Sequence, residues 1–351
     1  MSRISMRFSP PRALVVLFIL LVLAACSADS DSGTASAEIG YMPILPDAQL
    51  FVNLEDGSLA DAGIEPKLVS FQNGPAMVQA LLGGQLDIAY FGIGPTMVAR
   101  GKGADIKVVA SNIIEQISFV ALGDLAPYFD DGDPATAFAR FAADTGRKAR
   151  VSTFPVGSVP QTVLQYWIRK QLGANPDDVD VIYQGASQVQ QSLLTGAVDG
   201  AAILEPVVSI VKHRMPDARV VARGEQMFPG QPGAVVAVRA AFIEAHPKVV
   251  QKLVAAHARA SAQLRAGDDD AIDAVHKYVG GGRLPREIVA TAVHNSADSF
   301  VADPNRIVDG TRRMHDFQAE IGTLKADLDI DTLFDTHFYD AIDTAQAVAG
   351  Q

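Results

Sequence analysis

Two short stretches of the sequence could hold a small anion through their backbone. Residues 91–96 read FGIGPT and residues 154–162 read FPVGSVPQT, and in each a glycine stands just before the expected start of a helix. The first N–H groups of a helix have no partner inside it, and with the helix dipole they favour an anion. Two such helix starts facing one cleft would hold a small sulfonate or carboxylate without any arginine.

The side chains of these stretches suit the same role. The glycines allow close backbone approach, a proline begins the first helix, a serine is the expected N-cap of the second, and polar side chains stand in the first turns. The candidates are Gly92, Gly94, Pro95 and Thr96 in the first stretch and Gly157, Ser158 and Gln161 in the second. Taken alone, each stretch is explained by a turn and a cap. Their paired placement favours a binding site.

Glu205 is a candidate for a second kind of contact. It precedes Pro206 and is expected to face the same cleft. A carboxylate beside two anion-attracting helix starts would suit a ligand with separated charges, such as an amino-sulfonate. The alternative is that Glu205 satisfies the dipole of the helix that follows it.

Motifs of enzymes are missing from the sequence. It contains no G-x-S-x-G, H-E-x-x-H, P-loop or dinucleotide fingerprint. The seven histidines all lie from His213 onward, scattered through expected helices, and are expected on surfaces rather than in a metal cage. We therefore predict a binding protein with no catalytic residues, metal or cofactor.

Composition limits the class of protein. With 351 residues and 48% hydrophobic residues, the chain is long enough for two globular domains. The net charge of -11 and the absence of a clustered basic face argue against a nucleic-acid partner.

The N-terminus has the pattern of an export signal. Arg3, Arg7 and Arg12 precede an apolar run at residues 13–23, which is too short to span a bilayer as a stable helix. The run leads into LAAC at 23–26, which resembles the lipobox of bacterial lipoproteins, and Cys26 is the only cysteine. We expect a signal peptide at 1–25, lipidation of Cys26 and a polar tether at 26–37. An ordinary signal peptide with an incidental cysteine is the alternative.

The rest of the chain alternates short apolar strands with helical stretches, which predicts an α/β fold with right-handed crossovers and largely parallel sheets. Turn-rich breaks at 125–134 and 229–233 suggest an inserted lobe.

The sequence also contains an internal repeat. LLGGQLDIAYFGIGP at 81–95 is similar to LLTGAVDGAAILEP at 193–206. Two similar lobes that each present such a turn to a shared cleft would explain the repeat, although chance similarity in an Ala- and Leu-rich chain would also produce it.

Several blocks in this order resemble the periplasmic substrate-binding proteins of bacterial ABC importers, in the branch that takes up taurine, alkanesulfonates, nitrate or thiamine precursors. They are IGYMP at 39–43, the block at 73–111, GSVPQTVLQYW at 157–167, LLTGAVDGAAILEPVV at 193–208, AFIEAHPKVVQKL at 241–253 and DLDIDTLFD at 327–335. The sequence departs from the family pattern at Leu204, where relatives often have tryptophan.

The resemblance implies a type II binding-protein fold, with two doubly wound sheets, a two-crossing hinge and a helical C-terminal tail. It places lobe 1 at 38–122 and 230–351, lobe 2 at 123–229, and hinges near 121–124 and 228–233. It adds Tyr41, Met42, Pro43, Gln72, Gly185, Ser187 and Phe228 to the candidate ligand-binding residues. It further implies an exported, membrane-anchored monomer that delivers its ligand to a permease with a cytoplasmic ATPase. The alternatives are a biosynthetic enzyme or a sensory domain on the same fold.

Overall fold

The computed structural model describes residues 34–342. The predicted signal peptide and Cys26 lie outside the described residues, as does most of the predicted tether. The first strand begins at Ala35, so the last three residues of that tether belong to the folded body. Among residues 34–342, no helix combines the length and the apolar character that crossing a membrane requires.

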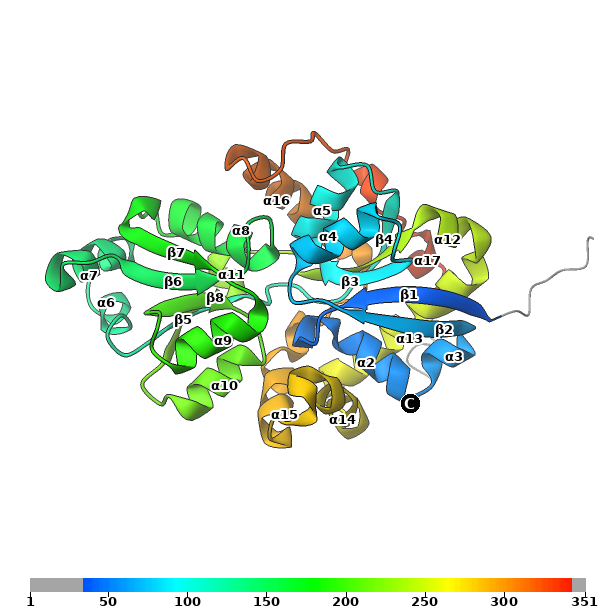
Figure 1. Ribbon diagram of the computed structural model, residues 1–351, viewed down its shortest axis with the longest axis horizontal. Helices are drawn as coiled ribbons and strands as arrows, with labels where there is room; N and C mark the ends of the chain where they lie inside the picture. Colours follow the sequence, from blue (N-terminus) through cyan, green and yellow to red (C-terminus); the bar gives the residue numbers. More distant parts are fainter. Residues whose placement is uncertain (1–33, 343–351) are drawn as a thin grey trace, which may run out of the picture. The chain divides into compact units, whose positions relative to one another are not determined.

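The described chain from Ala35 onward forms one compact unit that contains two mixed β-sheets (Figure 1). In spatial order, the first sheet consists of β2 (Ile64–Ser70), β1 (Ala35–Tyr41), β3 (Ile88–Gly92), β10 (Ala234–Arg239) and β4 (Ile106–Ser111). The second consists of β7 (Val179–Tyr183), β6 (Ala149–Thr153), β8 (Gly200–Ile203), β5 (Ser118–Ala121) and β9 (Arg219–Ala222). In each sheet the first three strands are parallel, and the fourth is antiparallel to both of its neighbours. The α/β expectation is confirmed.

The two sheets have equivalent strand orders, which explains the repeated sequence pattern. Strands β3 and β8 occupy the same central position in their sheets, and each follows the repeated turn. Gly84 and Gly196 have positive φ values of 72° and 67° in those turns. The turns lie at the beginning of β3 and β8, however, whereas the candidate ligand loops come at or after the end of a strand. The turn residues Gly84 and Gly196 are therefore structural, whereas Pro95 and Pro206, which end the two copies of the pattern, line cavities between the lobes.

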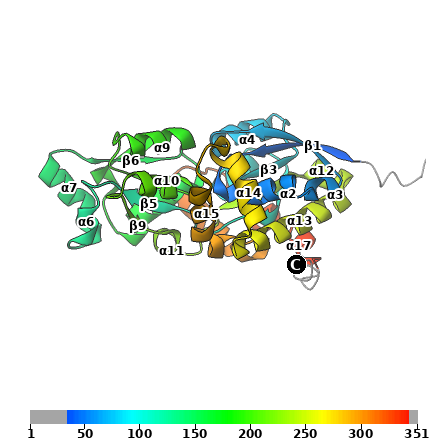
Figure 2. The ribbon, with the colours of Figure 1, turned by 90° about the horizontal axis from the view of Figure 1, so that it is seen from below.

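Helices cover both faces of the sheets, as Figures 1 and 2 show. Around the first sheet they are α2 (Ala48–Glu55), α3 (Ser58–Asp61), α4 (Gly74–Leu82), α5 (Ile93–Gly101), α12 (Ala240–Ala245), α13 (Pro247–Ala266), α14 (Asp269–Tyr278), α15 (Arg286–Asn295), α16 (Val308–Glu320) and α17 (His337–Asp340). Around the second they are α6 (Pro127–Asp130), α7 (Ala137–Thr145), α8 (Val159–Tyr166), α9 (Ala186–Leu194), α10 (Val207–Arg214) and α11 (Gly224–Met227).

Short helical turns complete the described chain. They are η2 (Leu45–Asp47), η3 (Pro134–Thr136), η4 (Trp167–Gln171), η5 (Pro176–Asp178), η6 (Val279–Gly282), η7 (Ala297–Ser299), η8 (Pro304–Ile307) and η9 (Asp331–Leu333). The turn η4 is π-helical and extends α8 without a break.

Strand β3 shows how the first sheet is buried on both faces. Ala89 and Phe91 pack in one hydrophobic cluster with α4 and α5, while Ile88 and Tyr90 pack in a second cluster with α2 and α13. All four side chains are at most 1% exposed. A strand buried on both faces reads as a continuous apolar run, as the sequence of β3 does.

The chain crosses between the sheets at residues 112–117 and 223–233. The first crossing precedes the expected boundary at 122, because β5 pairs with β8 and β9 in the second sheet. We therefore assign 35–111 and 234–342 to lobe 1 and 118–222 to lobe 2. The two crossing segments pair with each other: Ile114 bridges Pro232, and Glu115 N–H donates to the Gln231 carbonyl at 2.9 Å.

Candidate functional site

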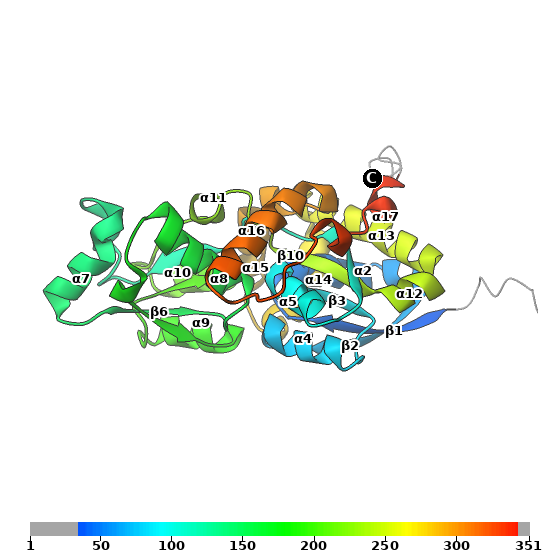
Figure 3. The ribbon, with the colours of Figure 1, turned by 90° about the horizontal axis from the view of Figure 1, so that it is seen from above.

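The starts of α5 and α8, one from each lobe, meet face to face. A β-carbon added to Gly94 would lie 3.1 Å from the carbonyl oxygen of Gly157, and one added to Gly92 would lie 2.8 Å from Cγ2 of Val159. Only glycine at these two positions lets the helix starts approach so closely. Figure 3 shows α5 and α8 beside α16, which packs against both of them.

Cavities lie along the boundary between the lobes in the described part of the chain, and three of them share lining residues in a row. The central one has a volume of about 30 Å³ and is lined from lobe 1 by residues that include Met42, Asp47 and Pro95, and from lobe 2 by residues that include Ser158 and Leu204. The cavities on either side have volumes of about 530 Å³ and 440 Å³. The first shares Pro95 with the central cavity, and the second shares Met42 with it.

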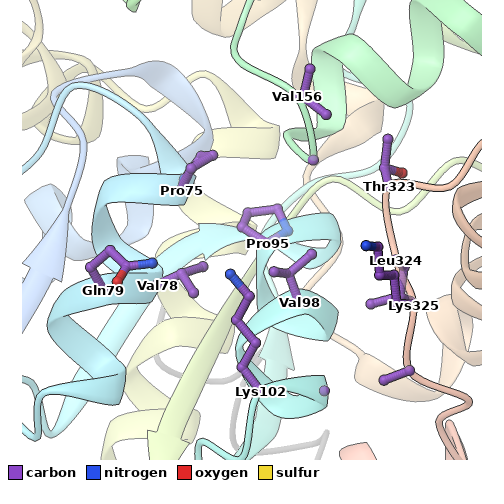
Figure 4. Close-up of a pocket in the computed structure, with 13 residues that line it drawn as sticks. Pro75, Val78, Gln79, Pro95, Val98, Lys102, Val156, Thr323, Leu324 and Lys325 are labelled. Atoms are coloured by element: carbon purple, nitrogen blue, oxygen red, sulfur yellow. The ribbon is translucent and has the colours of Figure 1, made fainter.

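The 530 Å³ cavity has an apolar floor and a cationic rim (Figure 4). Val78, Pro95 and Val98 form the floor, and Lys102 extends over them from the end of α5. Lys325 belongs to the segment at 323–326 that forms the opposite wall. This cavity can attract an anion toward the cleft.

Many of the predicted site residues line these cavities. In the central cavity they are Met42, Gly92, Pro95 and Ser158. In the 440 Å³ cavity they are Met42, Pro43, Gln72 and Ser187, and in the 530 Å³ cavity they are Pro95 and Gly157. Gly94 lies at the contact between the helix starts, and Gly185 lies close to Gln72 across the lobes.

Some predicted contacts are made inside the protein instead. Thr96 was expected to offer its hydroxyl to a ligand, but Oγ1 donates to the Gly92 carbonyl at 2.8 Å. Gln161 uses Oε1 to accept from Gly157 N–H at 3.1 Å. Ser158 is the N-cap of α8 as predicted, since Oγ accepts from Gln161 N–H at 3.4 Å.

The carboxylate of Glu205 is also used inside the protein. Oε2 accepts from Ser209 N–H and Oε1 from the Ser209 hydroxyl, each at 2.9 Å, and Nδ2 of Asn295 donates to Oε1 at 3.1 Å. Glu205 lines none of the three cavities. The alternative reading, an acid that satisfies the start of the following helix, therefore fits the structure better.

Two aromatic candidates pack away from the cavities. Phe228 was expected to cover the apolar part of a ligand, but it is 0% exposed and stacks on Tyr166 with ring centroids 3.8 Å apart. Tyr41 packs edge-on against Phe51 at 5.8 Å. Phe228 belongs to the buried core and Tyr41 packs against the core while only partly buried, since large rings contribute most through burial.

The sequence analysis did not identify three residues that lie at the cleft. Asp47 and Gln116 line the central cavity, and each has a buried side-chain oxygen with no hydrogen-bond partner within residues 34–342. Gln318 lies between the helix starts, where Nε2 donates to Thr162 Oγ1 at 2.9 Å. Asp47 ends a short turn and Gln318 sits on a C-terminal helix, so no local motif marks either residue.

Burial governs the electrostatics of lobe 1. Desolvation raises the pKa of the Asp47 carboxyl well above its usual range, and the hydrogen bond from Met42 N–H opposes this shift only in part. Desolvation also lowers the pKa of His257 to about 4, against a smaller opposing effect of its bond to the Ser111 carbonyl. His257 is 0% exposed and His315 is 8% exposed, so the expectation that the histidines lie on surfaces is wrong for these two residues. Within the described part of the chain, no group of His, Cys, Asp or Glu side chains is arranged to hold a metal.

The family model for NMT1-like proteins matches residues 30–280, more than half of the chain. This chain belongs to the NMT1-like family. The resemblance to binding proteins of ABC importers is thus confirmed at the level of family.

Relatives agree with this placement. A Brucella abortus (strain 2308) protein named as a binding protein is 27% identical over 235 residues, covering 64% of this chain and 65% of the relative. A Bacillus subtilis (strain 168) protein named as an aliphatic sulfonates-binding protein is 25% identical over 335 residues, covering 93% of this chain and 94% of the relative. The match thus spans slightly less than two thirds of the Brucella relative and nearly all of the Bacillus one.

Solved structures show the same fold. The periplasmic nitrate-binding protein of Synechocystis superposes with a TM-score of 0.74 at 15% identity, covering 90% of this chain and 89% of that one. The alkanesulfonate-binding protein of Xanthomonas axonopodis superposes with a TM-score of 0.67 at 20% identity, covering 83% of this chain and 95% of that one. These neighbours confirm a periplasmic-binding-protein fold.

Proposed function

We propose that this protein is the extracytoplasmic solute-binding component of an ABC importer, and that it captures a small anionic or zwitterionic organic solute between its lobes. The observation that carries the proposal is the meeting of α5 and α8 across the central cavity. Each lobe contributes one helix start, so a bound anion would gain favourable contacts from both only when the lobes are together.

The donors available to an anion follow from the two helix starts. Prolines at Pro95 and Pro160 have no N–H, and the Ile93 amide donates to the Gly233 carbonyl at 2.8 Å. We assign the amides of Gly94 and Val159 and the hydroxyl of Ser158 to the ligand. The cavity of about 30 Å³ has room for about one water. The neighbouring cavities of about 530 Å³ and 440 Å³, which share Pro95 and Met42 with it, provide the further room that a larger solute needs.

The paired segments at 112–117 and 223–233 are proposed to act as the hinge. Glu115 has a φ of 49°, a conformation that non-glycine residues rarely adopt, and its Oε1 accepts from Gly230 N–H at 2.6 Å. Because these two short crossing segments are hydrogen-bonded to each other, they are suited to a rigid-body opening of the lobes.

We further propose that the protein is exported and anchored through a lipid on Cys26, and that a permease with a cytoplasmic ATPase receives its ligand. The support is the sequence of the N-terminus and the family. Mass spectrometry of the protein purified from membranes tests the anchor: a diacylglyceryl group on Cys26 is expected, and an unmodified cysteine in a full-length or cleaved chain would refute it.

A thermal-shift screen of the purified protein tests the binding function. The panel contains taurine, alkanesulfonates, nitrate and aminopyrimidines, and a ligand at 100 times its Kd stabilises the folded state by about 2.7 kcal/mol. We expect stabilisation by an anionic or zwitterionic member, with compaction in small-angle scattering. Turnover of a bound compound would instead support the enzyme alternative.

A further inference from the structure

Asp47 has one carboxylate oxygen that the fold uses and one that it does not. Oδ2 accepts a hydrogen bond from Met42 N–H, with 2.8 Å between nitrogen and oxygen, and thereby stabilises the loop after β1. Oδ1 is buried and has no partner in the described chain, and the whole residue is 1% exposed. Buried polar atoms are nearly always hydrogen-bonded, so an exception calls for an explanation.

No positively charged side chain of the described residues pairs with Oδ1 of Asp47. The residues that line the central cavity include no lysine, arginine or histidine. Asp47 forms no ion pair within residues 34–342, and the nearby Tyr90 hydroxyl is itself without a partner. A buried carboxylate is costly unless it is paired. An asparagine oxygen could brace Met42 equally well, so the fold alone does not require an acid here.

Gln116 adds a second acceptor to the same cavity. Its Oε1 is buried and without a partner in the described chain, and it approaches from the crossing segment at 112–117. The cavity thus combines acceptor oxygens from Asp47 and Gln116 with the donor-rich helix starts at Gly92 and Ser158. A ligand that satisfies both sides needs an anionic group and a hydrogen-bond donor in one small molecule.

We infer that Asp47 determines specificity by binding the protonated amine of a small zwitterion whose anionic group lies at the starts of α5 and α8. The inference rests on the proposed function and narrows its ligand to the amino-sulfonate or amino-acid class. It transfers to Asp47 the role that the sequence had assigned to Glu205, whose two oxygens are occupied by Ser209 and Asn295.

Isothermal titration calorimetry with a matched ligand pair tests the inference. The probes are 2-aminoethanesulfonate and ethanesulfonate, which differ only in the amine, and the proteins are wild type, Asp47→Asn and Glu205→Gln. We expect wild type to bind the amino-sulfonate at least about tenfold more tightly, which is 1.4 kcal/mol or more. Asp47→Asn should lose this preference and still bind ethanesulfonate, and Glu205→Gln should keep the preference.

Each other outcome has a defined meaning. Equal binding of the two sulfonates by wild type, or an undiminished preference in Asp47→Asn, overturns the role of Asp47 but leaves the proposed function standing. Loss of the preference in Glu205→Gln alone returns the role to Glu205. Wild type that binds no member of the sulfonate, nitrate and aminopyrimidine panel refutes the proposed function itself. If Asp47→Asn does not fold, Asp47→Ser, which keeps a small acceptor for Met42, replaces it.

Discussion

Gln318 Nε2 donates a 2.9 Å hydrogen bond to Thr162 Oγ1 and so joins the C-terminal helix α16 to the first turn of α8 in lobe 2. Gln318 is 0% exposed, and its Nε2 would lie 2.9 Å from a β-carbon on Gly94. One side chain therefore stands at the point where α5, α8 and α16 converge. A contact of this kind exists only when the lobes are together.

Gln318→Ala is expected to weaken ligand binding about tenfold, because the closed arrangement loses a buried hydrogen bond that contributes about 1 kcal/mol and leaves a gap. Calorimetry with the ligand found in the screen measures this. Gln251→Ala is the matched control, since Gln251 Nε2 donates to the Phe338 carbonyl at 2.8 Å within lobe 1. Equal losses of affinity in the two variants would contradict a role for Gln318 in closure.

Gly94→Ala is expected to reduce affinity by about 5- to 150-fold through steric resistance to closure, since forced overpacking costs about 1–3 kcal/mol. The added methyl would lie 3.1 Å from the Gly157 carbonyl oxygen across the boundary between the lobes, and 2.9 Å from Gln318 Nε2 within lobe 1. Small-angle scattering with saturating ligand should show less compaction than wild type. Gly123→Ala, whose new carbon would lie 3.8 Å from the nearest side chain, should behave as wild type. Full compaction of Gly94→Ala would rule out this clash.

Acid should destabilise lobe 1 through His257. Its pKa is lowered to about 4 in the folded protein, whereas the unfolded chain takes up the proton near pH 6.5. The unfolded state therefore binds more protons, and stability falls as pH decreases from about 6.5 to 4, by up to about 3 kcal/mol. Urea unfolding of wild type and His257→Gln across this range measures the effect. A His257→Gln variant with the same slope as wild type would show that other groups cause it.

Asp47→Asn should stabilise the ligand-free protein at neutral pH. The raised pKa of Asp47 means that the folded protein holds this proton more tightly than the unfolded chain, so the contribution of Asp47 to stability is lost as pH rises above its usual range. Asparagine removes this penalty and can still accept from Met42. Thermal unfolding at pH 7.5 should show a higher Tm than wild type. A lower Tm would mean that the carboxylate is stabilised by a partner in solution.

The two aspartates of the repeated turn should differ in importance. Asp199 accepts from Arg150 N–H at 2.7 Å and from both terminal nitrogens of Arg147, whereas Asp87 accepts from Glu38 N–H at 3.0 Å and has Arg239 4.0 Å away. We expect Asp199→Ala to lower the free energy of unfolding by about 2 kcal/mol more than Asp87→Ala, because charge-assisted hydrogen bonds are the stronger ones. Chemical denaturation measures both, and equal losses would mean that the Arg147 pair contributes little.

The sequence by itself determined the alternation of strands and helices and the two helix starts. Strand β3 and helix α5 were readable because apolar runs, glycines and N-cap residues act within a few positions of the chain. The repeat at 81–95 and 193–206 correctly indicated two similar lobes. The cap at Ser158 was likewise a local property.

Only the tertiary structure decided which polar groups are satisfied. The sequence pointed to Glu205 and did not mark Asp47, but Glu205 meets Asn295 from a helix 90 positions away, whereas Asp47 has one oxygen left without a partner beside a cavity shared by both lobes. The lobe assignment of β5 was decided in the same way, by its pairing with β8 and β9. The physical reason is that burial and hydrogen-bond satisfaction depend on which distant segments the fold brings together, and no local pattern records that.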